Sequence, residues 1–329
     1  MFFCFLYATT LNVQSSLPII VDTDAGTDDM MALAYLLSVP DVRVEAVTVV
    51  HGAAHVREGA RNIRRLLYLA GKANIPVFDG EERPLNASRG FRPFPAEWRA
   101  LSDRLPGVDL PQIADPPSTE GAVTFLKTRL RDPGQPVRIL ALGPLTHLGI
   151  ILQSVPEAAK TIDQLVIMGG AVSVPGNLSG GNPEKAANDV AEWNIYGDPQ
   201  AADVVFKSGI KTLLVPLDAT MHVPITRNFV EDFRHHNLTP LGRVVLQVLD
   251  AALPLINTHT YFAWDPLASA ALVDSSLVTA RQGSIEVVTR GKNIGRTKLV
   301  KWNSGSRLSI ALDANAASFQ SMFERAFAK

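Results

Sequence analysis

The sequence predicts an α/β fold, in which an open and mostly parallel central sheet carries helices on both faces. Three observations lead to this prediction. Short apolar runs of strand length alternate with segments of helical periodicity. The 329 residues, 47% of them hydrophobic, can build the core of one large domain. Polar segments follow several of the apolar runs, at the strand ends where open α/β sheets hold ligands.

The first strand is expected at Ile19 to Val21, directly after Pro18, and an apolar-faced helix begins at Met30. The remaining elements follow in alternation, which implies βαβ units. Further strands are predicted at 44–50, 76–78, 137–142, 164–168 and 211–217, and helices at 30–37, 56–70, 119–130 and 199–207. Without a repeat or a low-complexity linker, residues 18–329 are expected to form a single domain. The proline-rich stretches Arg83–Pro95 and Pro106–Pro117 are expected to be long loops at the rim of a site.

The overall composition narrows the classes of function. A formal net charge of −1 without a run of Lys and Arg gives no reason to expect a nucleic-acid partner. Cys4 is the only cysteine, which excludes an intramolecular disulfide and a cysteine-based zinc site. The apolar start, residues 1–8, is too short to span a bilayer. Residues 1–17 are expected to be a flexible tail or a signal-peptide remnant, which favours export, with a cytoplasmic location as the alternative.

Four carboxylates gather on the turn between the first strand and the first helix. They are Asp22, Asp24, Asp28 and Asp29. Carboxylates this close repel one another, and burying them is costly without a compensating cation. A hard cation such as Ca²⁺ or Mg²⁺ is the simplest partner. Two alternatives stay open: single Asp residues could cap backbone amides, and Asp22 could be the nucleophile of a dehalogenase-type phosphatase, although Ala25 interrupts that motif.

Further motifs follow the later strands and the start of a late helix. With the acidic turn, they resemble in content and order the inosine-uridine nucleoside hydrolase family, calcium-dependent enzymes that hydrolyse the N-glycosidic bond of ribonucleosides. The motifs are Asp22–Asp29 (DTDAGTDD), Ala141–Thr146 (ALGPLT), Met168–Gly170 (MGG), Glu192–Asn194 (EWN) and Trp264–Pro266 (WDP). The resemblance runs from about Pro18 to near the C-terminus. It implies the Rossmann-like nucleoside hydrolase architecture, a ribonucleoside as the small-molecule partner and a homodimer or homotetramer.

The resemblance also implies the ligands of the metal and the catalytic base. Asp24, Asp29 and Asp265 would bind Ca²⁺ through carboxylate oxygens, and Leu142 through its backbone carbonyl. Asp24 would also act as the base that takes a proton from a water activated by the metal. The water oxygen would then attack C1′ of the ribose as positive charge develops on the sugar.

The same resemblance assigns the contacts to the ribose. Asp28 and Asn194 would hold the 2′- and 3′-hydroxyls, Asn177 and Glu192 the 5′-hydroxyl, and Met168 would lie beside the ring. Asn177 also fits a turn, and its role could pass to Asn182 or Asn188. The spacing of Glu192 and Asn194 would place both on one side of an extended segment. Met168 also fits a core position by residue type alone.

Two departures from the family pattern bear on the base that leaves. Ala53 stands where much of the family has an asparagine, and His51 or His55 could replace that polar contact or lie on the surface. Trp264 stands where the inosine-uridine-preferring branch has a histidine. Since an indole cannot donate a proton as an acid but can stack on a base, purine nucleosides are the favoured substrates. Trp98, in the proline-rich loop, would cover the other face of the base or merely anchor the loop. A non-catalytic nucleoside- or sugar-binding homologue remains the other alternative.

Overall fold

The computed structural model describes residues 17–85, 94–114, 118–178, 188–301 and 308–329. It contains a nine-stranded sheet with the order β3-β2-β1-β4-β5-β6-β9-β7-β8. Neighbouring strands are parallel from β3 through to β9, and β7 runs antiparallel to both β9 and β8. The strands are β1 (Ile19–Thr23), β2 (Val44–Val49), β3 (Val77–Asp79), β4 (Val137–Ala141), β5 (Ile162–Met168), β6 (Thr212–Val215), β7 (Val278–Val287), β8 (Thr297–Val300) and β9 (Leu308–Ala314).

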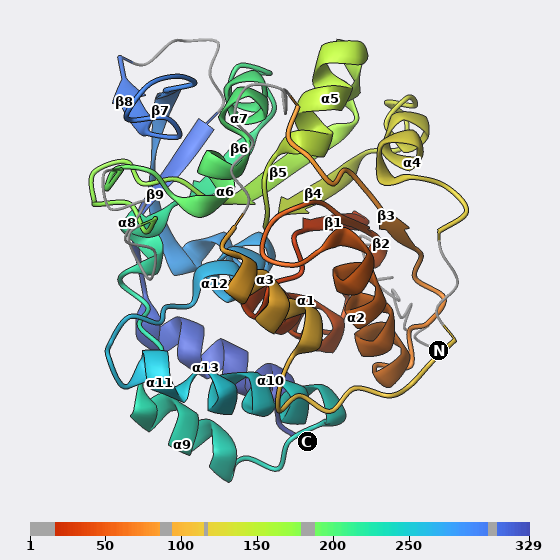
Figure 1. Cartoon of the computed structure of the whole chain (residues 1–329), viewed down its shortest axis with the longest axis vertical. Helices are drawn as coiled ribbons and strands as arrows, with labels where there is room; N and C mark the ends of the chain where they lie inside the picture. The colour runs from red at the N-terminus through yellow and green to blue at the C-terminus, as the bar shows by residue number, and fades with distance from the viewer. Residues whose placement is uncertain (1–16, 86–93, 115–117, 179–187, 302–307) are drawn as a thin grey trace, which may run out of the picture.

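Helices cover both faces of this sheet (Figure 1). They are α1 (Thr27–Ser38), α2 (Val56–Leu69), α3 (Ala96–Arg104), α4 (Ala122–Arg129), α5 (Thr146–Ser154), α6 (Trp193–Gly197), α7 (Pro199–Phe206), α8 (Leu217–Thr220), α9 (Arg227–His235), α10 (Pro240–Ala251), α11 (Leu253–Ile256), α12 (Trp264–Val273) and α13 (Ala316–Phe327), with short 3-10 turns at Pro156–Lys160 and Ser275–Leu277. The predicted α/β class with a mostly parallel sheet is therefore confirmed. None of the described helices has the length and apolar character needed to cross a membrane.

Alternation along the central strands explains why the sheet has two covered faces. In β1, Ile19 and Val21 join the larger buried cluster, whereas Ile20 between them joins a second cluster on the opposite face. In β5, Val166 and Met168 belong to the larger cluster and Ile167 to the second. Each strand is apolar on both sides, as expected for parallel strands buried between two layers of helices.

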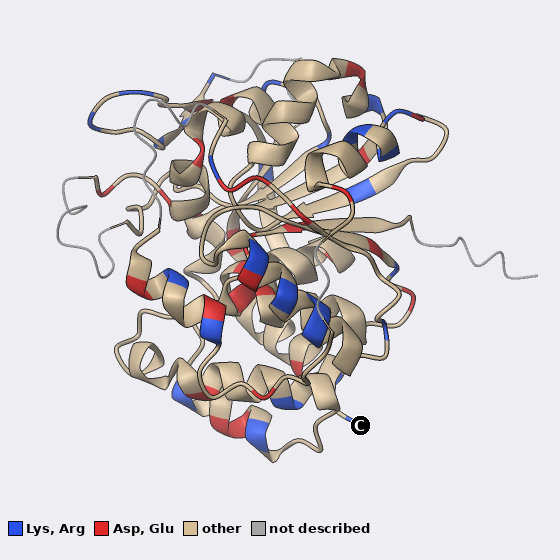
Figure 2. Cartoon of the chain, turned by 45° about the vertical axis from the view of Figure 1, so that its right-hand side comes forward, with Lys and Arg blue, Asp and Glu red and all other residues tan. Residues whose placement is uncertain are grey.

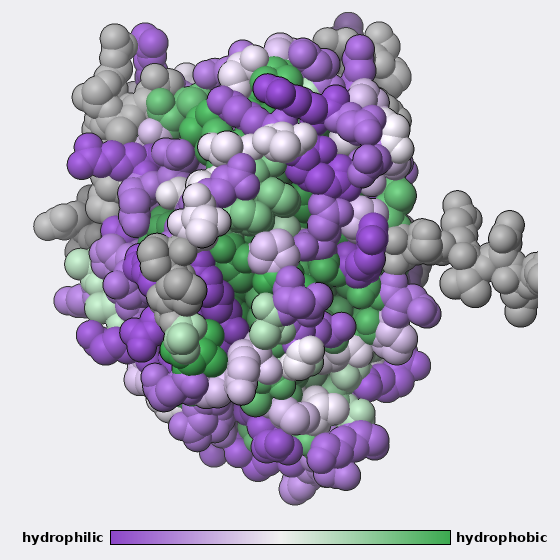
Figure 3. Space-filling model, turned by 90° about the vertical axis from the view of Figure 1, so that its right-hand side faces the viewer, coloured by the Kyte–Doolittle hydropathy of each residue, from purple (hydrophilic) through white to green (hydrophobic). Residues whose placement is uncertain are grey.

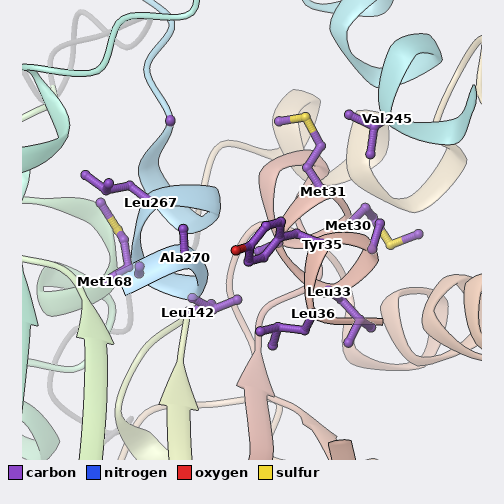
Figure 4. Close-up of a cluster of buried hydrophobic side chains, with 14 of the residues drawn as sticks. Met30, Met31, Leu33, Tyr35, Leu36, Leu142, Met168, Val245, Leu267 and Ala270 are labelled. Atoms are coloured by element: carbon purple, nitrogen blue, oxygen red, sulfur yellow. The ribbon is translucent and has the colours of Figure 1, made fainter. Parts of the chain in front are cut away.

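The larger cluster lies between the sheet and α1, α10, α12 and α13, and the second lies under α4, α5 and α7. Figure 4 shows part of the larger cluster, where Tyr35 and Leu36 on α1 approach Leu142, Met168 and Ala270. This packing fixes α1 and α12 against the ends of β4 and β5. Because the first turns of α1 and α12 both carry carboxylates, the hydrophobic core determines how closely those carboxylates approach.

All six predicted strands and four predicted helices are present, with ends that differ by a few residues. The late helix expected at Trp264 is present as α12, whereas the sequence patterns did not predict strands β7, β8 and β9 or helices α9, α10, α11 and α13. Helix α3 begins right after the proline-rich stretch that was expected to be a loop, so the placement of Trp98 in a loop was wrong. The proposed tail lies outside the described residues apart from Leu17.

Charged residues of both signs are interspersed on the face shown in Figure 2, in line with the net charge of −1. The face shown in Figure 3 is mostly hydrophilic, with hydrophobic residues visible between the polar ones.

Candidate active site

The site lies where the strand order reverses. Strand β1 is flanked by β2 on one side and β4 on the other, and Asp22 near its carboxyl end pairs with Thr48 and Ala141. The connection after β1 runs toward one edge of the sheet and the connection after β4 toward the other, so the following loops diverge and open a crevice. The acidic turn is therefore held at the position where open α/β sheets bind ligands.

Asp29 organises the turn from β1 into α1. Its carboxylate accepts hydrogen bonds from the hydroxyl of Thr23 and from the N–H of Gly26, the latter at 2.9 Å. Ala25 adopts a left-handed φ of 57°, which turns the chain sharply before the helix. Asp28 and Asp29 then occupy the first turn of α1, where the helix dipole favours negative charge.

Three carboxylates from two helices converge on one point. Oxygen atoms of Asp28, Asp29 and Asp265 all lie within 4.8 Å of one another. Asp265 comes from the first turn of α12, which packs against α1. Asp24 lies alongside: after burial, the charge of Asp29 is the next cause of its raised pKa, and its Oδ2 accepts the N–H of Ala53 at 3.0 Å. The arrangement brings together all three predicted carboxylate ligands and adds Asp28 to them.

Burial makes this cluster electrostatically unfavourable without a cation. Desolvation, followed by repulsion from Asp29, raises the pKa values of Asp24 and Asp265 well above that of an ordinary aspartate. The same two causes raise the pKa of Asp28 to about 7, and burial raises the pKa of Asp29. A bound divalent cation would reverse this penalty, and an all-oxygen donor set suits Ca²⁺ or Mg²⁺. The residues therefore fit a hard metal ion.

Asp22, the remaining acid of the turn, has a bracing role. Its Oδ1 accepts the hydroxyl of Thr48 and lies 2.7 Å from Nδ1 of His147. Nε2 of His147 accepts the N–H of Glu81, so the ring proton is on Nδ1 and is donated to Asp22. With Asp22 only 2% exposed and bonded in this way, the geometry favours bracing over the phosphatase nucleophile.

Asn194 links the ends of two neighbouring strands. Its Nδ2 donates to the backbone carbonyls of Leu142 at 3.0 Å and Met168 at 3.2 Å. The carbonyl predicted to bind the metal is thus oriented by an amide from α6 and keeps one lone pair for a further partner. Met168 is 3% exposed and packs in the larger core cluster, as its residue type suggested.

Glu192 and Asn177 hold the neighbouring loop. Glu192 caps α6: its carboxylate accepts the N–H groups of Asn194, Ile195 and Gly170. The expectation of an extended segment through Glu192 and Asn194 was wrong, because the buried carboxylate starts a helix there. Asn177 Oδ1 accepts the N–H of Trp193 at 3.2 Å, which agrees with the turn alternative.

Of the two residues named as substitutes for Asn177, Asn182 lies outside the described residues. The other, Asn188, donates from Nδ2 to the carbonyl of Ile294 at 2.8 Å.

Aromatic side chains gather on segments that adjoin the acidic residues. Trp98 and Ala53 pack with Trp193 in a third, smaller cluster, where the two indole rings are 5.4 Å apart and edge-on. Trp264 contacts the rings of Tyr261 and Phe262. Trp98 and Trp264 are both half-buried, so each has some surface left for a ligand.

Sequence reasoning missed several neighbours of the acids because they come from distant segments. His51 proves to be buried, and its Nε2 lies 3.0 Å from the hydroxyl of Thr146, which in turn donates to Asp198. His55 is exposed and pairs with Asp103 on α3, which agrees with the surface alternative for that residue. Tyr261 lies close enough for Asp28 to raise its pKa; the aromatic run before Trp264 was the available signal.

The sheet, the switch point and the buried acids define a class: an α/β protein with a metal-type carboxylate site at the carboxyl edge of its strands. Comparison with known proteins then identifies the family. The profile of the inosine-uridine preferring nucleoside hydrolases matches residues 19–321, and the chain belongs to that family. The family assignment drawn from the sequence motifs is thereby confirmed.

Individual relatives differ in the bases they prefer. The chain is 33% identical over 285 residues to the pyrimidine-specific ribonucleoside hydrolase RihA of Salmonella typhimurium, covering 84% of this chain and 86% of that enzyme. Among solved structures, the plant nucleoside hydrolase PpNRh1 superposes with a TM-score of 0.80 at 28% identity, covering 94% of this chain and 98% of the other. The purine-preferring ribonucleoside hydrolase of Gardnerella vaginalis gives 0.80 at 25% identity, covering 94% and 97%.

Proposed function

We propose that this chain is a calcium-dependent nucleoside hydrolase that cleaves the N-glycosidic bond of ribonucleosides and favours purine nucleosides. The single observation that carries the catalytic part is the buried carboxylate cluster at the switch point of the sheet. Family membership supports the reaction class. The identity of the metal as calcium and the preference for purine nucleosides are separate parts of the proposal, and each needs its own test.

Asp24, Asp29 and Asp265 would hold the metal, together with the carbonyl of Leu142 and with Asp28 close by. A bound Ca²⁺ would offset the repulsion among these carboxylates and lower the pKa of a nearby water. Calcium is favoured over magnesium because the donors come from several loops and include a backbone carbonyl, a set that accommodates its flexible coordination.

Asp24 is proposed as the base. The N–H of Ala53 donates to its Oδ2, and the N–H of Ala54 donates to its backbone carbonyl, so both the carboxylate and the backbone of Asp24 are tied to this segment. Burial, followed by repulsion from Asp29, raises the pKa of Asp24 and so favours proton uptake by this carboxylate. In the reaction, the water oxygen bonds to C1′ and its proton passes to Asp24. The C1′–N bond breaks, and its electron pair stays on the base nitrogen.

The purine preference rests on the two half-buried indoles. Trp264 opens α12 directly beside Asp265, and Trp98 packs against the same cluster as Ala53, whose N–H donates to Asp24. A base held next to C1′ would lie near both, and a two-ring purine offers more surface for stacking than a pyrimidine. The 33% identity to a pyrimidine-specific enzyme points the other way, so the base preference must be measured directly.

The experiment measures release of reducing ribose from inosine, guanosine, adenosine and uridine. The wild type should act on purine nucleosides with the higher kcat/KM. Trp264→Ala should lower purine turnover about fivefold, since an aromatic contact contributes on the order of 1 kcal/mol, and uridine turnover less. Trp264→Phe, which keeps an aromatic face, serves as the matched control and should retain most activity. Equal losses on both base classes would overturn the stacking argument, and tight binding of inosine without turnover would favour the non-catalytic alternative.

A further inference from the structure

Helix α3 brings a permanent cation to the segment that holds the proposed base. Nη2 of Arg99 donates to the carbonyl of Ala54 at 3.3 Å. In the same segment, the N–H groups of Ala53 and Ala54 both donate to Asp24. The first donates to its carboxylate and the second to its backbone carbonyl. Arg99 is therefore one short segment away from the carboxylate that would take the proton of water.

Two further observations place the guanidinium inside this region. Its charge is one cause of the low pKa of His51, the residue at the end of β2, so Arg99 also lies near that side chain. Nε of Arg99 is buried and has no hydrogen-bond partner among the described residues. At least one N–H group of Arg99 is thus without an acceptor among the described residues.

Neither Trp264 nor His51 can serve as the acid for the departing base. Trp264 cannot supply a proton at neutral pH. His51 cannot either, because burial lowers its pKa to about 3 and leaves the ring neutral. When the C1′–N bond breaks, the electron pair remains on the base, and a base that leaves without prior protonation carries a negative charge. A fixed cation stabilises that charge without transferring a proton.

We propose that Arg99 is a specificity-determining residue that stabilises the negative charge of the departing base, working beside Trp98 on the same helical turn. The inference rests on the proposed function. Trp98 packs in the cluster that includes Trp193 and Ala53, and the N–H of Ala53 donates to Asp24, so α3 lies against the segment that contacts the proposed base. In Figure 1, α3 lies in front of the first turns of α1 and α12. After its release, the negatively charged base accepts a proton from solvent.

The test compares leaving groups of different stability in Arg99→Met and Arg99→Lys. Inosine has a poor leaving group that needs stabilisation, whereas 4-nitrophenyl β-D-ribofuranoside releases a phenolate that is already stable. Arg99→Met should lower kcat on inosine about 100-fold, the usual effect of removing one charge-stabilising donor, and change kcat on the nitrophenyl riboside less than about threefold. Arg99→Lys keeps the charge and should lose only about tenfold on inosine.

Arg104→Met, an exposed arginine at the other end of α3, is the control and should retain full activity on both substrates. Equal losses of Arg99→Met on both substrates would overturn the proposal, because a merely structural role would slow every leaving group alike. Undiminished activity on inosine would overturn it as well. Activity of the wild type on the nitrophenyl riboside alone would refute the purine preference but leave the role of Arg99 measurable through a series of substituted phenyl ribosides. If Arg99→Met does not fold, the ratio of the two activities in Arg99→Lys decides in the same way.

Discussion

Gly52 lies so close to Asp24 that a single methyl group should disable the proposed base. A Cβ built on Gly52 would lie 2.0 Å from Oδ2 of Asp24 and 2.5 Å from its Cβ, whereas ordinary contacts begin at 3.4 Å. The Asp24 side chain in Gly52→Ala must therefore retreat by more than ~1 Å, which also strains its bond to Ala53. A displacement of about 1 Å at a reacting group costs roughly 100-fold in rate.

The assay is kcat/KM for ribose release, measured together with the melting temperature. Gly52→Ala should fold, because this glycine does not need a left-handed φ, and should lose at least about 100-fold in kcat/KM. Gly121→Ala is the matched control, since the nearest atom to its added Cβ would be 3.9 Å away, and its activity should stay within about twofold. A folded Gly52→Ala with normal kcat and KM would refute the assignment of Asp24 as the base.

Three further predictions concern charge and burial around the site. Asp24→Asn should abolish turnover. The same variant should raise the stability of the chelator-treated protein by on the order of 1–3 kcal/mol in denaturant titrations, because one of several repelling carboxylates is removed. A less stable variant would contradict the electrostatic argument. His51 has a folded-state pKa of about 3 against an ordinary value of 6.5, so only the unfolded chain takes up its proton between these pH values. The free energy of unfolding should therefore fall by about 2 kcal/mol from pH 7 to pH 5, and His51→Asn should remove that part of the decline; an unchanged slope would contradict the buried neutral ring. His147→Leu should cost about 2–5 kcal/mol in urea unfolding, because Asp22 and the N–H of Glu81 lose their partner, whereas exposed His222→Leu should cost less than about 0.5 kcal/mol; similar losses would argue against the His147 network.

The sequence carried the part of the fold that depends on local pattern. The apolar run at Ile19 to Val21 and the carboxylates behind it predicted both β1 and the acidic turn, because strand, turn and helix signals agree there. The proline-rich region hid α3, since prolines outside a short helix dominate the pattern around it. Strands β7 and β9 pair antiparallel at the far edge of the sheet, a long-range arrangement that no local pattern specifies.

The site was predictable in its residue types and less so in its contacts. Asp24, Asp29 and Asp265 were expected together as ligands; Asp29 and Asp265 do converge, but the third carboxylate within 4.8 Å of both is Asp28. The partners that orient them were not expected, because His147 and Asp22 are 125 positions apart and meet only through the sheet register. The amide of Asn194 reaches the carbonyls of two strands for the same reason.

The most direct test of the central claim is ribose release from inosine after the protein has been treated with a chelator and then resupplied with Ca²⁺. The buried carboxylate cluster predicts loss of nearly all activity on chelation, recovery on adding Ca²⁺, and no recovery in Asp29→Asn at the same calcium concentration. Full activity in the chelator, or no release from any nucleoside under any metal condition, would contradict the account.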